Sequence, residues 1–120
     1  MIIEDFVSFE LAKLLKEKGF NQLCYTHYSH DGQNVYYNYQ TPYDGINMPT
    51  LQMAMKWLRE VHNLYVDIIL HSVNRTLIYE ARIDKINSPS DIDVILPQIN
   101  EPIYENACEA AIKYCLENLV

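Results

Sequence analysis

The sequence has few of the features that mark enzymes, metalloproteins and nucleic-acid-binding proteins. It contains no GxGxxG, Walker, GxSxG or HExxH pattern, so the commonest phosphate-binding, nucleophile and zinc-protease motifs are missing. Lys and Arg number 9 against 16 Asp and Glu, which gives a net charge of −7 with no basic cluster to offset it. Because an acidic surface repels phosphate backbones, nucleic acid is a disfavoured partner. These absences favour a non-enzymatic protein, but they leave an enzyme open as an alternative, because catalytic sites are often assembled from scattered residues. No cofactor is predicted.

Long apolar runs and a basic leader are also missing. No hydrophobic stretch approaches the roughly 18 residues of a membrane span. Met1–Glu10 carries acids where a signal peptide needs basic residues. The 3 cysteines are an odd number, which favours reduced thiols over disulfides. We therefore expect a cytoplasmic protein without a membrane segment.

The composition that remains is that of a globular domain. The 120 residues are 49% hydrophobic and include 10 tyrosines. A chain of this length can bury roughly two-thirds of its unfolded surface. We predict a single domain that comprises residues 1–120.

The segment from Pro49 to Leu70 changes from helical to extended periodicity within a few residues. Thr50 is a suitable N-cap, because its hydroxyl accepts a hydrogen bond from an otherwise unpaired backbone N–H. The apolar spacing predicts a helix over Leu51–His62. Asn63 tolerates the left-handed conformation that ends a helix, so that Tyr65–Leu70 can follow at once as a strand.

Two further helices are predicted near the ends of the chain. Ser8 caps the first, and Gly19 with Phe20 predicts a left-handed Schellman ending. The last helix should run from Glu101 or Pro102 to Leu119. Its apolar face comprises Tyr104, Ala107, Cys108, Ala111, Ile112, Cys115 and Leu119.

Asp31-Gly32 predicts a two-residue hairpin turn that pairs His30 with Gln33. This register divides the hairpin into two faces, because alternate residues of a strand point to opposite sides. The face expected in the core comprises Cys24, Thr26, Tyr28, Val35, Tyr37 and Tyr39. The face expected in water comprises Tyr25, His27, Ser29, Asn34, Tyr36 and Asn38.

A second hairpin is predicted across Asn74-Arg75, with Val73 opposite Thr76. This register sets Asp67 across from Arg82, and such an opposite-charge pair supports it. The face expected in the core comprises Val66, Ile68, Leu70, Leu77, Tyr79, Ala81 and Ile83.

The stretch from Asp84 to Glu101 allows two interpretations. Ser88-Pro89-Ser90-Asp91 resembles a helix capping box with proline at the first helical position. Asp91-Ile92-Asp93-Val94 alternates like an edge strand. Thr41–Gly45 has the composition of a turn and loop.

These elements predict an α+β fold with the order helix, hairpin, helix, hairpin, helix. We expect one four-stranded, mainly antiparallel sheet with the helices packed on one face.

No metal site is predicted. Cys24, His27 and His30 are suitable ligand types, but residues three apart on a strand point to opposite faces. Cys108 and Cys115 lie on the apolar face of the last helix and are expected to fill the core.

Once the core residues are assigned, the tyrosines on the water-facing side of the first hairpin are the main feature left to explain. Tyr25, His27, Tyr36 and Asn38 share the face expected in water, and tyrosine is favoured in protein interfaces. We interpret these four residues as a candidate partner-binding site, although cross-strand aromatic pairing also places tyrosines there. A second copy of the chain could cover the same patch in a homo-oligomer.

Three blocks of this acidic, tyrosine-rich chain resemble a family of short uncharacterised proteins from phages, prophages and mobile elements of Bacteroides-type gut bacteria. The blocks are VSFELAKLLKEKGF at Val7–Phe20, PTLQMAMKWLREVHN at Pro49–Asn63 and ENACEAAIKYCLENLV at Glu105–Val120. The resemblance implies an origin in a phage or mobile element. Because no activity is assigned to these proteins, no functional residue is carried over from them.

The leading hypothesis is a small non-enzymatic interaction module that binds a host or self protein through a sheet face or edge strand. One alternative is an acidic nucleic-acid mimic that inhibits a host enzyme. The other is a small-molecule-binding protein or enzyme with a pocket near Trp57.

Overall fold

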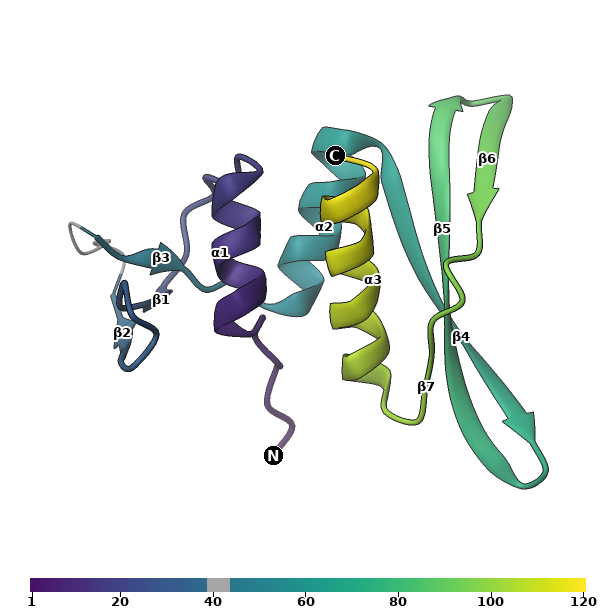
Figure 1. The fold of residues 1–120 in the computed structure, drawn as a ribbon, viewed down its shortest axis with the longest axis horizontal. Helices are drawn as coiled ribbons and strands as arrows, with labels where there is room; N and C mark the ends of the chain where they lie inside the picture. The colour runs from purple at the N-terminus through teal and green to yellow at the C-terminus, as the bar shows by residue number, and fades with distance from the viewer. Residues whose placement is uncertain (39–43) are drawn as a thin grey trace. The chain divides into compact units, whose positions relative to one another are not determined.

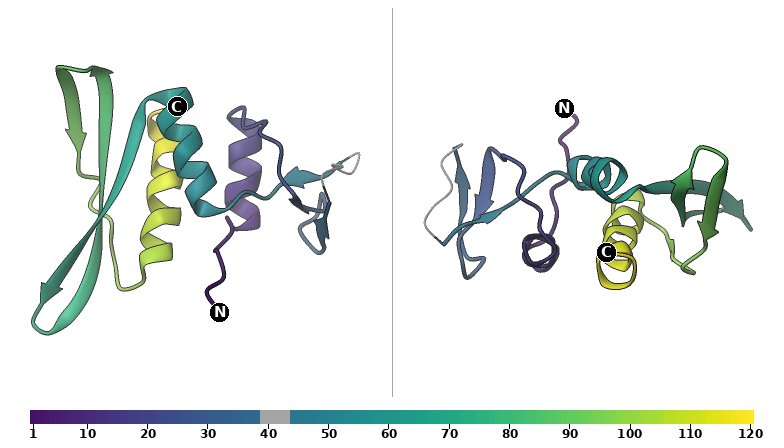
Figure 2. Two further views of the ribbon diagram at one scale, coloured as in Figure 1. Left: turned by 180° about the vertical axis from the view of Figure 1, so that it is seen from behind. Right: turned by 90° about the horizontal axis from the view of Figure 1, so that it is seen from above.

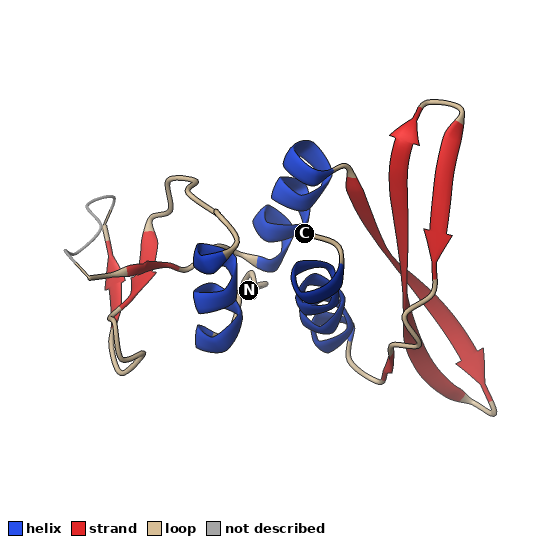
Figure 3. Cartoon of the chain, turned by 45° about the horizontal axis from the view of Figure 1, so that its top comes forward, coloured by secondary structure: helices blue, strands red, loops and turns tan. Residues whose placement is uncertain are grey.

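The computed structural model describes residues 1–38 and 44–120, which fall into two compact units, residues 1–54 and residues 55–120. Each unit is described by itself. The fold is α+β, with three helices and two antiparallel sheets among the described residues (Figures 1 and 3). The prediction of a single domain over residues 1–120 stays a prediction.

The expectation of one four-stranded sheet is wrong, because the two predicted hairpins belong to different sheets. The first hairpin gains a third strand from the segment before the central helix. The second gains two strands from the stretch that the sequence left open. Tyr39 and most of the Thr41–Gly45 loop prediction lie outside the described residues.

Helix α1 (Phe9–Glu17) begins and ends as predicted. The Ser8 hydroxyl accepts a hydrogen bond from the Leu11 N–H at 3.2 Å. Gly19 has φ 97°, and the Phe20 N–H donates to the Leu15 carbonyl at 2.9 Å. These contacts satisfy backbone groups that a helix end leaves unpaired.

The sheet of residues 1–54 contains β1 (Thr26–Tyr28), β2 (Val35–Tyr37) and β3 (Ile46–Asn47) in the order β2-β1-β3. The predicted register is confirmed, since Tyr28 pairs with Val35 and Thr26 with Tyr37.

The turn that joins β1 and β2 is wider than predicted. The Ser29 N–H donates to the Asn34 carbonyl at 2.9 Å, so residues 30–33 form the reversal. Of Asp31 and Gly32, only Gly32 has a positive φ, 76°. The Asp31 carboxylate instead accepts from the Ser29 hydroxyl and the Gln33 N–H, which holds the wider loop closed.

Helix α1 is tied to this sheet by contacts at its N-terminal end. The Tyr28 hydroxyl donates to the Val7 carbonyl at 2.6 Å. The Phe9 ring lies edge-on to Tyr28, with ring centroids 5.5 Å apart. A Cβ placed on Gly32 would lie 2.7 Å from the Phe9 ring. Glycine is therefore required at position 32 for its backbone angle and for the space beside Phe9.

Helix α2 (Leu51–His62) has the predicted bounds. The Thr50 hydroxyl accepts from the Met53 N–H at 3.1 Å. Asn63 has φ 55° and turns the chain directly into the next strand.

The sheet of residues 55–120 contains β4 (Leu64–Val73), β5 (Thr76–Ser88), β6 (Asp91–Ile95) and β7 (Asn100–Glu101). β4 and β5 pair without interruption from Leu64↔Lys85 to Val73↔Thr76, so the predicted register and the Asp67↔Arg82 pair are confirmed. Asn74 and Arg75 have φ 49° and 65°, as a type I′ turn requires. The open stretch forms strands, because β6 and β7 both pair with β5.

Helix α3 (Tyr104–Asn118) packs against β5, β4 and β7. It begins later than predicted, because Asn100 and Glu101 belong to β7. We call the sheet face that carries Ala81 and Ile83 the inner face; both residues are fully buried. The Tyr104 ring lies edge-on to Tyr79 on this face, with centroids 5.8 Å apart.

The predicted core of the second hairpin is wrong near its turn. Leu70 and Leu77 lie on the inner face but are 55% and 52% exposed. In Figures 1 and 2 the turn end of the β4–β5 hairpin extends past the start of α3. These two leucines therefore lie beyond the helix that was expected to cover them.

Gly19 and Gly32, which both have a positive φ, allow a matched test of the Phe9 contact. Gly32→Ala adds a methyl group against the Phe9 ring and strains the backbone, so we expect a loss of about 2 kcal/mol in the free energy of unfolding. Gly19→Ala meets nothing within 4 Å and should cost only about 1 kcal/mol. Urea denaturation measures both, and an equal loss in the two variants would contradict the packing of Phe9 on Gly32.

Candidate protein-interaction surface

Three of the four predicted site residues, Tyr25, Tyr36 and Asn38, are exposed. The predicted sidedness of the hairpin is wrong at two other residues, because Tyr37, expected in the core, is exposed and Ser29, expected in water, is buried. His27 is 0% exposed, so its expected place in water is wrong. The reason is β3, which pairs with β1 at His27↔Asn47 and makes β1 the central strand. A side-chain hydrogen bond with Asn47 accompanies this pairing. His27 is therefore an interior residue of its sheet.

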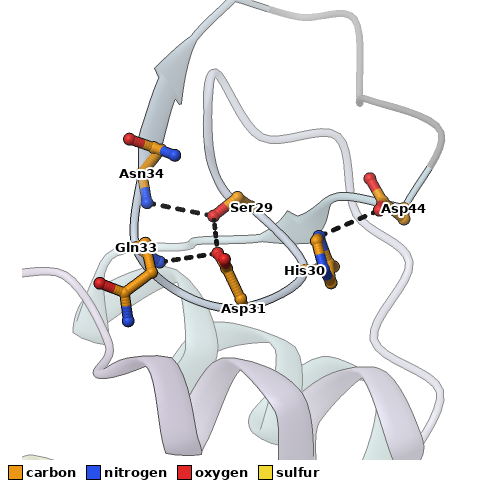
Figure 4. Close-up of polar contacts among 6 residues, drawn as sticks. All are labelled: Ser29, His30, Asp31, Gln33, Asn34 and Asp44. Atoms are coloured by element: carbon orange, nitrogen blue, oxygen red, sulfur yellow. Dashed lines mark hydrogen bonds and ion pairs between the residues drawn. The ribbon is translucent and has the colours of Figure 1, made fainter.

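Polar contacts gather in the loop after β1 (Figure 4). The Ser29 hydroxyl donates to Asp31 Oδ1 at 2.7 Å and accepts from the Asn34 N–H at 3.0 Å. Hydrogen bonds from the Ser29 hydroxyl and the Gln33 N–H lower the pKa of the Asp31 carboxyl.

His30 does not complete a catalytic arrangement with these groups. Its Nδ1 lies 3.1 Å from Asp44 Oδ2, on the other side of the loop from the Ser29–Asp31 contact (Figure 4). A nucleophilic serine needs a base within hydrogen-bond reach of its hydroxyl. The Ser29 hydroxyl donates instead to a carboxylate that also holds the Gln33 N–H, which indicates a structural loop.

The cysteines Cys24, Cys108 and Cys115 are free and buried. Burial raises the pKa of the Cys24 thiol to about 11 and that of Cys115 to about 12, and it raises the pKa of Cys108. Such thiols have little thiolate for nucleophilic attack or metal binding. Among residues 1–38 and 44–120, no group of three His, Cys, Asp or Glu side chains is placed to hold a metal ion.

The more extensive exposed surface lies on the four-stranded sheet, opposite the inner face. We call it the outer face. Residues 55–120 place α3 on the inner side and no helix on the outer side (Figures 1 and 2). Its apolar members at the β5–β6 end form the outer-face patch, defined as Tyr65, Ile86, Ile92 and Val94. Ile92 and Val94 are 50% and 52% exposed.

The charges on the outer face are paired within the sheet. Arg82 Nε donates to Asp84 Oδ1 at 2.9 Å, and this contact raises the pKa of Arg82. His71 Nε2 lies 3.0 Å from Glu80 Oε1. The Arg82 cation thus lies among the acids of this face, in contrast to the one-signed array that a nucleic-acid mimic needs.

The edges of this sheet differ in how they are protected. Within the described part of the chain, β4 pairs only with β5, so no strand pairs with the other edge of its 10 residues. β4 contains no proline and no lysine, and its pairing with β5 has no bulge. β6 has 5 residues, two exposed aspartates and a register shift beside it. Because charges, short length and bulges are what usually block edge pairing, β4 is the less protected edge.

Trp57 is only 5% exposed, and its ring lies edge-on to His62 with centroids 4.7 Å apart. Little of the indole surface is left for a ligand to stack on.

The described residues contain no helix whose length and apolarity would let it cross a membrane.

Sequence reasoning missed the outer-face patch. The alternation of Asp91-Ile92-Asp93-Val94 was the available signal, and it was left open because the capping-box pattern overlaps it. The exposure of Tyr65 on the outer face does follow from the predicted register of the second hairpin.

No protein-family model, curated protein or solved structure matches this chain.

The raised cysteine pKa values predict low thiol reactivity. At pH 8 a thiol with a pKa of about 11 carries on the order of one thiolate per thousand molecules. The native chain should therefore react with a thiol reagent far more slowly than the chain in denaturant. Fast labelling of native Cys24 or Cys115, located by mass spectrometry, is the contradicting result.

Buried His27 predicts a pH-dependent stability. Burial lowers the pKa of His27 below its usual 6.5, against a smaller opposing effect of the hydrogen bond with Asn47. The unfolded chain then binds the proton more readily, so the free energy of unfolding should fall as the pH drops through about 6.5. Urea denaturation between pH 7.5 and pH 5.5, values chosen about one unit either side of the usual pKa, measures this loss. His27→Gln should lose less stability over the same interval, and an identical loss would contradict the assignment.

Proposed function

We propose that this chain is a small non-enzymatic interaction module that binds another protein through the outer face of its four-stranded sheet. The observation that carries the proposal is the outer-face patch, which leaves apolar side chains half exposed on a face that no helix of residues 55–120 covers.

The two faces of the sheet differ in how far their apolar residues are buried, and this difference supports the proposal. Ala81 and Ile83 on the inner face are fully buried, whereas Ile92 and Val94 on the outer face keep about half of their surface in contact with solvent. Burying apolar surface is favourable by roughly 25 cal/mol per Å². The ion pair Arg82–Asp84 borders the apolar residues, since Asp84 pairs with both Tyr65 and Val94, as polar groups border the apolar centre of many interfaces.

Tyr25, Tyr36 and Asn38 offer a second surface of the same kind on the three-stranded sheet. Their exposure suits contact with a partner, and β2, which carries Tyr36, is an edge strand. We propose this surface as a second candidate binding site. His27 is not part of it, because His27 is buried.

The proposed setting is the cytoplasm of a bacterial host, with the chain encoded by a phage or mobile element. This setting depends on the resemblance of the three helical blocks. The paired acids of the sheet give less support to an acidic nucleic-acid mimic, and the enclosed Trp57 ring gives less support to a nearby ligand pocket.

The test is affinity capture from host lysate with three variants of the full chain. The double substitution Ile92→Ser and Val94→Ser should lower capture of the specific partner by at least about tenfold, which is the loss of about 1.4 kcal/mol. Val61→Ser, on an equally exposed aliphatic residue of α2, should leave capture unchanged. The pair Tyr25→Ser and Tyr36→Ser tests the second surface in the same assay.

Circular dichroism establishes that each variant is folded. Unchanged capture by both double variants would contradict the proposed function. Loss with the tyrosine pair alone would move the binding site to the three-stranded sheet.

A further inference from the structure

We infer that two copies of this chain join through their β4 edges, antiparallel and about a two-fold axis at Ile69, to form one continuous sheet. The strand order across the pair is β6-β5-β4-β4-β5-β6. This inference goes beyond the proposed function, because it concerns the β4 edge and not the outer face, and it names a second copy of the chain as the partner there.

The backbone groups available at the β4 edge follow from the hydrogen bonds of β5. The Ala81 N–H donates to the Ile99 carbonyl at 3.0 Å, on the side of β5 away from β4. In an antiparallel ladder, paired residues both point their N–H and C=O either toward each other or away. Ile68 is paired with Ala81, so its backbone groups point to the open edge. By alternation, so do those of Val66, Leu70 and Ser72.

A second hydrogen bond confirms this alternation. The Ile86 N–H donates to the Asn63 carbonyl at 2.9 Å, at the start of β4. The odd-numbered residues of β4 therefore bond to β5, and the even-numbered ones are left for an incoming strand.

One self-register fits the side chains of this edge. With Ile69 on the axis, Ile68 lies opposite Leu70 of the second copy, and both residues direct backbone groups to the shared edge. Each such pair can exchange two N–H···O bonds. Val66 and Ser72 pair in the same way, so four of the five even-numbered residues of β4 find partners on the second β4, and Leu64 lies opposite Asn74 of the turn.

The same register brings a carboxylate and an imidazole together. Asp67 lies opposite His71 of the second copy, at a pair without backbone hydrogen bonds, where side chains are closest. Moving the axis by one residue sets Asp67 against Ile69 or against Val73. In the proposed register, Tyr65 lies opposite Val73, and both are exposed apolar residues in the single chain.

The side chains along the edge favour a second copy over a strongly basic partner. Asp67 already lies near Arg82, and His71 lies 3.0 Å from Glu80. The β4 edge therefore presents one acidic and one imidazole side chain that complement each other under two-fold symmetry. Isologous contacts of this kind close after two copies.

Cysteine cross-linking of the full chain tests the register. Directly opposed residues in a pair without backbone hydrogen bonds have Cα atoms about 4.5 Å apart, within the range of a disulfide. Ile69→Cys should give a cross-linked dimer on mild oxidation. Val73→Cys is the matched control on the same face of β4, where the residue is more exposed but faces Tyr65 of the second copy. Cross-linking of Val73→Cys at the same rate as Ile69→Cys would overturn the register.

Light scattering over a range of concentrations tests the edge itself. The unmodified chain should dimerise, and Leu70→Pro, which removes an outward N–H without breaking the β4–β5 ladder, should raise the dimer dissociation constant by at least about tenfold. Leu70→Ser, which keeps that N–H, should change the dissociation constant less.

A chain that is monomeric at every concentration would overturn the inference. Equal effects of the two substitutions on the dissociation constant would overturn it as well. If a monomeric chain still captures its partner from lysate through the outer face, the proposed function is supported and only the self-pairing is contradicted.

Discussion

The β4–β5 ladder is the interaction on which the structure of residues 55–120 depends. Its register places Ala81 and Ile83 beneath α3 and sets Tyr65 on the opposite face. A shift of one residue would exchange these faces. The same ladder uses the odd-numbered backbone groups of β4 and leaves the even-numbered ones open. Core, exposed face and open edge therefore follow from one pairing.

The features that the sequence predicted correctly are local. Ser8 and Thr50 cap their helices, Gly19 and Asn63 end them in the left-handed region, and Asn74-Arg75 sets a register over the whole hairpin. Each depends on residues close together in the chain, where backbone preferences act directly.

The features that were missed depend on distant pairing. β3 joins β1 from beyond the loop after β2, and this contact buries His27. Nothing in the alternation of the first hairpin indicates a third strand. β6 and β7 pair with β5 through a stretch in which a capping-box pattern competes with strand alternation. Of the candidate site, Tyr25, Tyr36 and Asn38 keep their predicted exposure, whereas the outer-face patch required the β5–β6 register.

Amide hydrogen exchange measured by NMR tests the central claim most directly, because it reports the two sets of β4 amides separately. The account predicts that Asp67, Ile69 and His71 are protected at every protein concentration, since their N–H groups bond to β5. It predicts that Val66, Ile68, Leu70 and Ser72 gain protection only as the concentration rises and the edges pair. Fast exchange at the odd positions would contradict the ladder, and concentration-independent exchange at the even positions would contradict the edge pairing.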